Sequence, residues 1–239
     1  MRKLRVRGRK IAALWLIAAA LSVPARATPI VTNGSFEQSS NGLGYLSSSN
    51  TLTGWTVNST YSFLVAGSNS TQLGDGGYGN TTLWVGPGAS PDGGDFIASD
   101  GAFQTGSITQ TLTGLTVGTV YQIFFYQAAG QQSGFTGATT EWWTVGFGNQ
   151  SQNSTVMDDA SESEVGWMTQ SLNFEATSTT EVLSFLAGGT PDGEPPFSLL
   201  DGVSATAIPE PASLATMMGS LLGLIALRRF KKPRAATCI

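Results

Sequence analysis

Acidic side chains are the only charged groups that the central part of this chain offers for chemistry. The 239-residue sequence has 16 Asp and Glu, 12 Lys and Arg, and no His. All the acidic residues fall between Glu37 and Glu210, whereas every Lys and Arg lies before residue 27 or after residue 227. The net charge of −4 therefore conceals a strongly acidic segment, residues 28–227, without one basic side chain.

This distribution excludes several classes of function. A domain without Lys or Arg cannot neutralise phosphates, so we expect no nucleic-acid partner. The single Cys238 lies near the C-terminus, so the domain has no disulfide and no Cys nucleophile, and a zinc site is not expected without His or Cys ligands. Two chemistries stay open: acid–base catalysis by paired carboxylates, and binding of a hard cation through oxygen ligands.

The candidates for a catalytic acid pair are Glu141 and the acidic residues of segment 158–164, which are Asp158, Asp159, Glu162 and Glu164. Nothing apolar surrounds that segment in the sequence, so we expect a solvated loop and no buried acid. Binding an anionic polysaccharide without a basic residue is also electrostatically unfavourable. We therefore expect that the protein is not an enzyme, and keep a carboxylate-dependent glycosidase or lyase as the alternative.

Four aromatic residues are candidates for contacts with a sugar, because a flat indole or phenol ring packs well against the apolar face of a pyranose. Trp142 and Trp143 are adjacent, so in a strand they point to opposite faces and one is expected to be buried. Trp84 and Tyr78 lie in Gly-rich segments. The simplest interpretation of most other aromatic and aliphatic residues is core packing, as for Phe36, Leu112, Leu115, Tyr121, Phe124, Phe174 and Phe185.

Short strands must position these residues. Residues 107–112 alternate with period two, and residues 120–126 are aromatic and β-branched, as in a strand buried on both faces. Further strands are predicted at 141–147, 168–174, 182–186 and 199–205. Turn sequences separate them, at residues 91–94 and 191–193. The pattern predicts one all-β domain, a jelly-roll β-sandwich spanning residues 28–207.

A connected set of motifs resembles a known fold. The segments Asn33-Gly34-Ser35-Phe36-Glu37 and Leu200-Asp201-Gly202-Val203, with "QTLTGLTVGTVY" between them, resemble the galactose-binding-like jelly roll of carbohydrate-binding modules and of DUF642 proteins. The resemblance implies that the first and last segments are adjacent strands and that the middle motif is a hairpin. It also implies a structural Ca²⁺ beside those strands, with Glu37 and Asp201 as ligands.

The N-terminus has the three parts of a secretory signal peptide. Six Lys and Arg precede an apolar run from residue 11 to 21, and Ala25-Arg26-Ala27 supplies the small residues of a cleavage site. We expect residues 1–27 to be removed and the chain to be exported.

The C-terminal residues 208–239 resemble a PEP-CTERM sorting signal. They contain Pro209-Glu210-Pro211, an uncharged stretch at 212–227 that we expect to be a single transmembrane helix, and a basic stop formed by Arg228, Arg229, Lys231 and Lys232. The resemblance implies that an exosortase of a Gram-negative bacterium reads this signal. The protein would be an intermediate anchored in the inner membrane before it reaches the cell surface.

These observations together predict an exported, surface-sorted, non-catalytic protein that binds carbohydrate or structures an exopolysaccharide matrix. A surface-coat protein without a specific ligand is a further alternative, which the sequence does not separate from the first.

Overall fold

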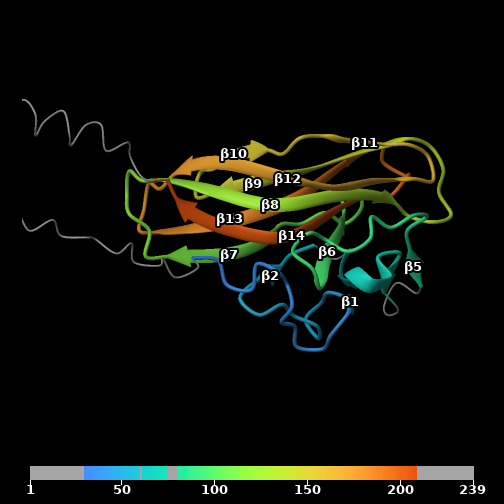
Figure 1. Cartoon of the computed structure of the whole chain (residues 1–239), viewed down its shortest axis with the longest axis horizontal. Helices are drawn as coiled ribbons and strands as arrows, with labels where there is room; N and C mark the ends of the chain where they lie inside the picture. The colour runs from blue at the N-terminus through green and yellow to red at the C-terminus, as the bar shows by residue number, and fades with distance from the viewer. Residues whose placement is uncertain (1–29, 60, 75–79, 209–239) are drawn as a thin grey trace, which may run out of the picture.

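The computed structural model of this chain describes residues 30–59, 61–74 and 80–208 (Figure 1). Within these ranges the chain is built from β-strands and one short 3-10 helix, η1 (Gly67–Asn69). The strands are β1 (Gly44–Tyr45), β2 (Thr56–Val57), β3 (Ser62–Ala66), β4 (Gln72–Gly74), β5 (Thr81–Thr82), β6 (Asp95–Asp100), β7 (Ile108–Thr113), β8 (Val120–Gln131), β9 (Thr139–Phe147), β10 (Gln150–Asn153), β11 (Met157–Asp159), β12 (Glu164–Glu175), β13 (Thr180–Thr190) and β14 (Pro196–Ala207).

Two antiparallel sheets form the body of the molecule. The first has the order β1-β3-β6-β14-β8-β12, and the second has the order β10-β9-β13-β7-β2, with β11 paired to β9. The chain passes from one sheet to the other between β6, β7, β8 and β9, and again between β12, β13 and β14, as in a jelly roll. A small β4–β5 hairpin lies beside the first sheet. The predicted all-β sandwich is confirmed.

The main core lies between the two sheets. In β9 alternate residues from Thr139 to Phe147 are buried, because successive side chains in a strand point to opposite faces. Phe125 and Leu200 from the first sheet pack in the same cluster as Trp143 and Phe185 from the second. A second cluster, which includes Phe63, Leu83, Phe96 and Phe197, covers the outer face of the first sheet.

Several local predictions are confirmed, and two of those for residues 107–126 are wrong. Strands occupy the predicted positions, and a turn at residues 90–93 is closed by the Gly93 N–H, which donates to the Ser90 carbonyl. The first half of β8 alternates instead of being buried on both faces, so Phe124 is half-buried and packs against Tyr126. The motif "QTLTGLTVGTVY" is not a hairpin, because β7 and β8 belong to different sheets.

The first and last motifs do lie side by side, as the resemblance implies. The Val203 N–H donates to the Gly34 carbonyl at 2.9 Å. Residues 33–37 are nevertheless an irregular segment and not a strand, since Asn33 and Phe36 have positive φ angles of 51° and 56°. These conformations break the regular pleat that a β-ladder requires.

The predicted signal peptide at 1–27, Tyr78 and the sorting segment from Pro209 onward lie outside the described residues. The helix predicted at 212–227 falls in that part, and the described part contains no helix that is long and apolar enough to cross a membrane.

Candidate functional site

A pocket of about 240 Å³ opens at the end of the first sheet. Four neighbouring strands position its lining. Tyr61 comes directly before β3 and Asp100 ends β6, while Gln132 follows β8 and Pro195 precedes β14. Because adjacent strands are antiparallel, residues far apart in the sequence meet at this edge: Phe197 pairs with Asp100, and Pro196 with Gln131.

Aromatic rings form the walls of this pocket. Phe103 is 47% exposed and meets the buried ring of Tyr61 edge-to-face, with 5.4 Å between ring centroids. Phe135 lies in the loop between β8 and β9, and its carbonyl accepts a 2.7 Å hydrogen bond from the Trp84 indole N–H. The Tyr61 hydroxyl donates to Gln132 Oε1 at 3.0 Å, which orients that amide at the pocket.

A buried carboxylate lies at the pocket. Asp100 is fully buried, and its Oδ1 accepts hydrogen bonds from the backbone N–H groups of Ala102 at 2.8 Å and Phe103 at 3.0 Å. Its Oδ2 has no partner. Burial raises the pKa of Asp100 to about 6; the two N–H groups oppose this rise and the charge of Asp192 adds to it. Asp100 thus holds the Phe103 loop with one oxygen, and its other oxygen is enclosed behind that loop without a partner.

A second candidate is the surface acidic group, formed by Glu37, Asp92, Asp95 and Asp201. Glu37 Oε1 accepts the Asp95 N–H at 2.7 Å, and Asp201 Oδ1 accepts the Gly202 N–H at 2.7 Å, while Asp201 Oδ2 is buried without a partner. Burial raises the pKa of Asp201 to about 7; Ser90 and the Gly202 N–H oppose this, and the charges of Asp92 and Glu37 add to it.

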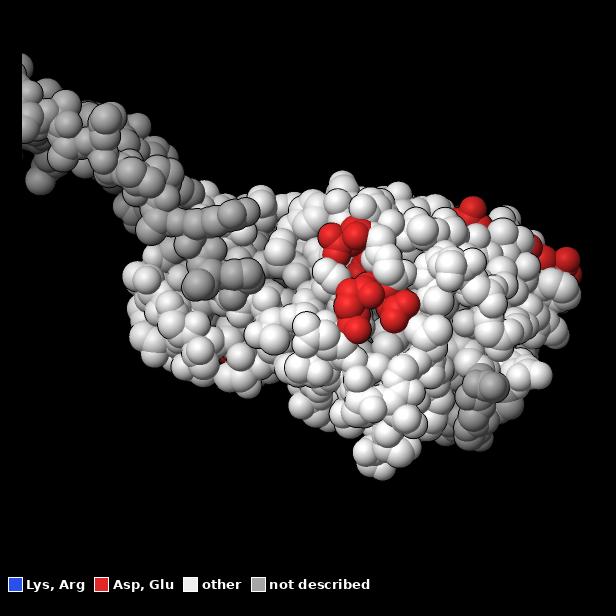
Figure 2. Space-filling model, turned by 60° about the horizontal axis from the view of Figure 1, so that its bottom comes forward, with Lys and Arg blue, Asp and Glu red and all other residues white. Residues whose placement is uncertain are grey.

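The surface acidic group brings the two predicted Ca²⁺ ligands, Glu37 and Asp201, into one neighbourhood. On the face shown in Figure 2, several acidic side chains gather in a compact group near the middle, others lie toward the right-hand end, and no Lys or Arg is seen among the described residues. Among the described residues, no three His, Cys, Asp or Glu side chains already converge as a metal site. The oxygen-only donor set fits a hard cation, with carbonyls or water completing the shell.

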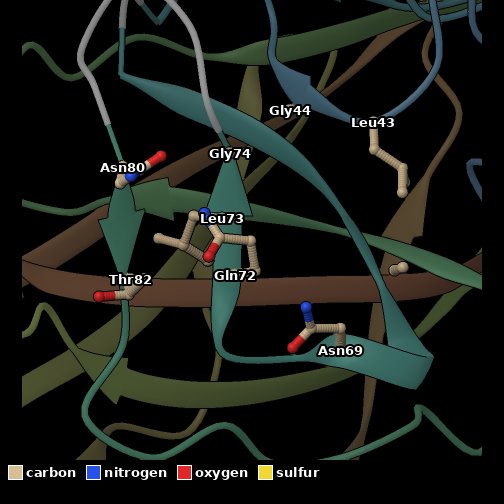
Figure 3. A pocket seen from close by; sticks show the side chains of 9 residues that line it. Leu43, Gly44, Asn69, Gln72, Leu73, Gly74, Asn80 and Thr82 are labelled. Carbon is tan, nitrogen blue, oxygen red and sulfur yellow. The ribbon is translucent and has the colours of Figure 1, made fainter.

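A second hollow, of about 510 Å³, lies between the β4–β5 hairpin and the segment around Leu43. Figure 3 shows Asn69, Gln72, Asn80 and Thr82 around it, so its described lining is rich in amides and carries no aromatic ring. Residues 75–79, which follow Gly74 and precede Asn80 in the sequence and include Tyr78, lie outside the described part.

The two adjacent tryptophans alternate as expected. Trp143 is fully buried between the sheets, and its indole N–H donates to the Leu199 carbonyl at 3.0 Å, so it is a core residue and cannot contact a ligand. Trp142 is half-buried on the outer face of the second sheet, with its ring over Gly188. Trp84 is exposed beside the pocket through its bond to Phe135.

The expectation that segment 158–164 is a solvated loop is wrong for Asp159. Met157–Asp159 forms β11 against β9, which buries Asp159 while Asp158 and Glu162 are exposed. Burial raises the pKa of Glu141 to about 8 and that of Asp159 to about 6. The sequence analysis missed this burial because the apolar surroundings come from other strands.

The sequence analysis also missed Tyr61, Asp100, Phe103 and Phe135. A signal for two of them was present, since Phe103 and Phe135 lie in Gly-containing segments of the sequence, as Trp84 and Tyr78 do. Nothing in the sequence indicates that these loops meet, because this depends on the order of the strands in the sheet.

Solved structures with similar folds include carbohydrate-binding modules. TmCBM61, in complex with β-1,4-galactotriose, is 12% identical; the match covers 76% of this chain and 100% of that one, with a TM-score of 0.43. A family 16 carbohydrate-binding module-2 is also 12% identical over 74% of this chain and 99% of that one, with a TM-score of 0.36.

The enzymatically active domain of bacteriophage CBA120 tailspike protein 4 is 14% identical over 75% of this chain and 21% of that one, with a TM-score of 0.38. These similarities carry no conclusion about function. A comparison with curated proteins finds no match. A family model described as "Protein of unknown function (DUF642)" matches residues 29–204. Because this match spans most of the chain, the protein belongs to the DUF642 family.

Proposed function

We propose that this protein is a non-catalytic carbohydrate-binding protein and that it binds sugar in the pocket between Tyr61, Asp100, Phe103 and Phe135. The observation that carries the proposal is the pairing of aromatic walls with a buried carboxylate that has one oxygen without a partner. A pyranose presents an apolar face to a ring and hydroxyl donors at its edge, so Phe103 and Asp100 Oδ2 match the two parts of one sugar.

Size and charge restrict the ligand. A pocket of about 240 Å³ is smaller than those that enclose drug-sized ligands, so it accommodates one sugar ring at a time. Residues 28–227 contain no Lys, Arg or His, and Asp192 also lines the pocket. An anionic sugar would be repelled, and the proposed ligand is a neutral sugar unit of a polysaccharide.

Burial argues against catalysis by the acid pairs predicted from the sequence. A glycosidase requires two carboxyl groups that flank the scissile bond in an accessible site. Glu141 and Asp159 are both buried in the protein interior, whereas the acidic residues accessible beside them, Asp158 and Glu162, lack burial that would tune them as a general acid. These positions suit a structural role better than catalysis.

The proposed setting is the cell surface. The signal peptide at 1–27 and the sorting segment at 208–239 support export, recognition by an exosortase, a transient inner-membrane anchor and delivery to an exopolysaccharide matrix. Mass spectrometry of the protein recovered from cells and medium would test this. We expect a form that begins at Thr28 and ends near Pro211, and peptides from residues 228–239 in the released protein would contradict it.

A structural Ca²⁺ at Glu37 and Asp201 is part of the same proposal. The buried Asp201 Oδ2 without a partner supports it. A ligand that binds only the folded state at 100 times its dissociation constant adds about 2.7 kcal/mol to the free energy of unfolding. Melting of the wild type, Glu37→Gln and Asp201→Asn with Ca²⁺ and with excess chelator tests it. Equal melting temperatures of the wild type under both conditions would exclude the site.

Sugar binding is tested with the purified full chain by isothermal titration with neutral monosaccharides and oligosaccharides. Asp100→Asn keeps the Oδ1 acceptor for the Phe103 loop and replaces Oδ2 by a donor, and Phe103→Ala removes the stacking surface. Each is expected to weaken binding by about tenfold or more. The control Glu37→Ala, in the surface acidic group, should bind sugar as the wild type does.

Binding that is unchanged in both pocket variants would contradict the proposed pocket. No binding to any neutral sugar by the wild type would favour the surface-coat alternative.

A further inference from the structure

Three side chains place their oxygens in the protein interior where β9 pairs with β11. Thr139 and Glu141 share one face of β9 with the core residue Trp143, since alternate residues of a strand point the same way. Asp159 lies opposite Thr139, and Glu141 lies opposite Met157, so Glu141 and Asp159 are diagonal neighbours on one face. Diagonal neighbours on an antiparallel pair are within reach of each other's side chains.

These oxygens are sealed from solvent and lack partners. Glu141 is 0% exposed, and Thr139 and Asp159 are each 2% exposed. Thr139 Oγ1, both carboxylate oxygens of Glu141, both of Asp159 and Glu164 Oε2 make no hydrogen bond of good geometry. The Thr139 hydroxyl and the Ala160 N–H lie close enough to lower the pKa of Glu141 and Asp159 respectively, but burial outweighs both. Buried polar atoms in proteins nearly always have a partner, and a group of orphaned oxygens indicates an ion or water that belongs there.

The chain itself supplies no positive partner. Residues 28–227 contain no Lys, Arg or His, so only a proton or a metal ion can balance these carboxylates. Burial of an unbalanced carboxylate is strongly unfavourable, because the ion loses its hydration without gaining an opposite charge. The half-buried Glu164 adds another carboxylate at the edge of the group, through its charge on Asp159.

We propose that Thr139, Glu141 and Asp159 form an interior binding site for a hard divalent cation, Ca²⁺, with Glu164 at its outer edge. The ligands are oxygens only, without nitrogen or sulfur, which suits Ca²⁺ and not a transition metal. Two carboxylates neutralise its charge, and Ca²⁺ tolerates the irregular shell that a hydroxyl, carbonyls and water would complete. Since three acidic side chains do not converge here, the hydroxyl is an essential member of the set.

This interior site is separate from Glu37 and Asp201. Asp201 lies on β14 of the first sheet, whereas Glu141 and Asp159 lie on β9 and β11 of the second. A bound cation would hold β11 and the turn after it against β9. Ser161 in that turn accepts the Gly137 N–H at 2.8 Å, so the cation would also brace the loop that carries Phe135.

The test is a titration of Ca²⁺ into the chelator-treated full-length protein at about pH 8, where carboxylates at the site are available to a cation. We expect Glu141→Gln and Asp159→Asn each to bind one Ca²⁺ fewer per chain than the wild type, or to bind it about tenfold or more weakly. Asp158→Asn is the matched control, because Asp158 is on the same strand but exposed; it should bind as the wild type does. Asp201→Asn should keep this site.

A conservative variant and a luminescence measurement distinguish loss of the cation site from a folding defect. Thr139→Val keeps the shape of the side chain and removes only the hydroxyl, and it should weaken the same site. Tb³⁺ at this site should luminesce on indole excitation, because Trp143 lies two residues from Glu141, and Glu141→Gln should abolish that signal. Unchanged Ca²⁺ stoichiometry and affinity in Glu141→Gln, Asp159→Asn and Thr139→Val would overturn the proposal and leave protonated carboxyl groups as the explanation.

Discussion

The surface acidic group and the interior acidic group differ in how their negative charges are stabilised. The interior acidic group consists of Glu141, Asp159 and Glu164. In the surface group, Glu37 and Asp201 each accept a backbone N–H, from Asp95 and Gly202 respectively, and part of the group faces water. In the interior group, neither Glu141 nor Asp159 makes a hydrogen bond of good geometry, and the nearby Thr139 hydroxyl and Ala160 N–H only partly offset the cost of burial. Backbone N–H groups in a loop are free to donate to a carboxylate, whereas most backbone N–H groups in a strand already donate to the neighbouring strand.

Acidity alone does not identify a site in this chain. Sixteen acidic residues look alike in the sequence, but burial and available donors separate them. The interior group depends on a proton or a cation for its stability, and the surface group depends on them less. This comparison leads to three predictions.

The largest expected effect is on the stability of the chelator-treated protein between about pH 5 and about pH 8. A carboxyl whose pKa is higher in the folded than in the unfolded state binds more protons when folded, so the free energy of unfolding falls as pH rises toward the folded pKa. Burial raises the pKa of Glu141 from 4.5 to about 8 and that of Asp201 from 3.8 to about 7.

One pKa unit is worth about 1.4 kcal/mol, and 1 kcal/mol shifts Tm by roughly 2–4 °C in a domain of this size, so we expect Tm to fall on the order of 10 °C. Thermal melts at a series of pH values measure it. The part of the fall above about pH 7 should disappear in Glu141→Gln and persist in Asp201→Asn, because the Glu141 pKa is the higher one. If the fall above about pH 7 persisted in Glu141→Gln and disappeared in Asp201→Asn, the assignment of the higher pKa to the interior group would be wrong.

A backbone substitution separates the two groups with an intermediate effect. A Cβ on Gly34 would collide with the Val203 carbonyl, so Gly34→Ala should push the Glu37 segment away from β14. We expect a loss of about 2–3 kcal/mol in the free energy of unfolding and weaker Ca²⁺ binding at Glu37 and Asp201. Urea denaturation and Ca²⁺ titration measure both. If Tb³⁺ luminescence from the interior site fell equally, the two groups would not be independent.

The smallest effect is a contrast in sign between two side-chain replacements. In chelator at about pH 8, Glu141→Met should raise the free energy of unfolding by about 1–2 kcal/mol, since it removes a buried charge without a partner. Glu37→Ala should lower it by about 1 kcal/mol, since the Asp95 N–H loses its acceptor. Urea denaturation of both variants beside the wild type makes the comparison. Destabilisation by Glu141→Met would show that Glu141 has a partner in the folded protein.

Some features of this protein were decided by local sequence alone. Strict alternation put Trp142 and Trp143 on opposite faces, because the period of a strand is two wherever it pairs. Turn residues placed the break at residues 90–93. The expectations of no nucleic-acid partner and no His, Lys or Cys chemistry in residues 28–227 rest only on the distribution of charges and the position of Cys238, and they stay predictions. The signal peptide and the sorting segment also rest on sequence alone and stay predictions.

The tertiary structure decided what lies beside what. The pocket brings Tyr61, Asp100, Phe103 and Phe135 together because four strands of one sheet begin or end at the same edge. The order of these strands cannot be predicted from any single segment of the sequence. Asp159 is buried only because β11 pairs with β9, whereas Asp158 next to it is exposed. Local sequence sets the direction in which a side chain points. Long-range strand pairing determines whether that side chain then meets water, a hydrogen-bond donor or another carboxylate, and these surroundings determine its pKa and its ability to bind a ligand.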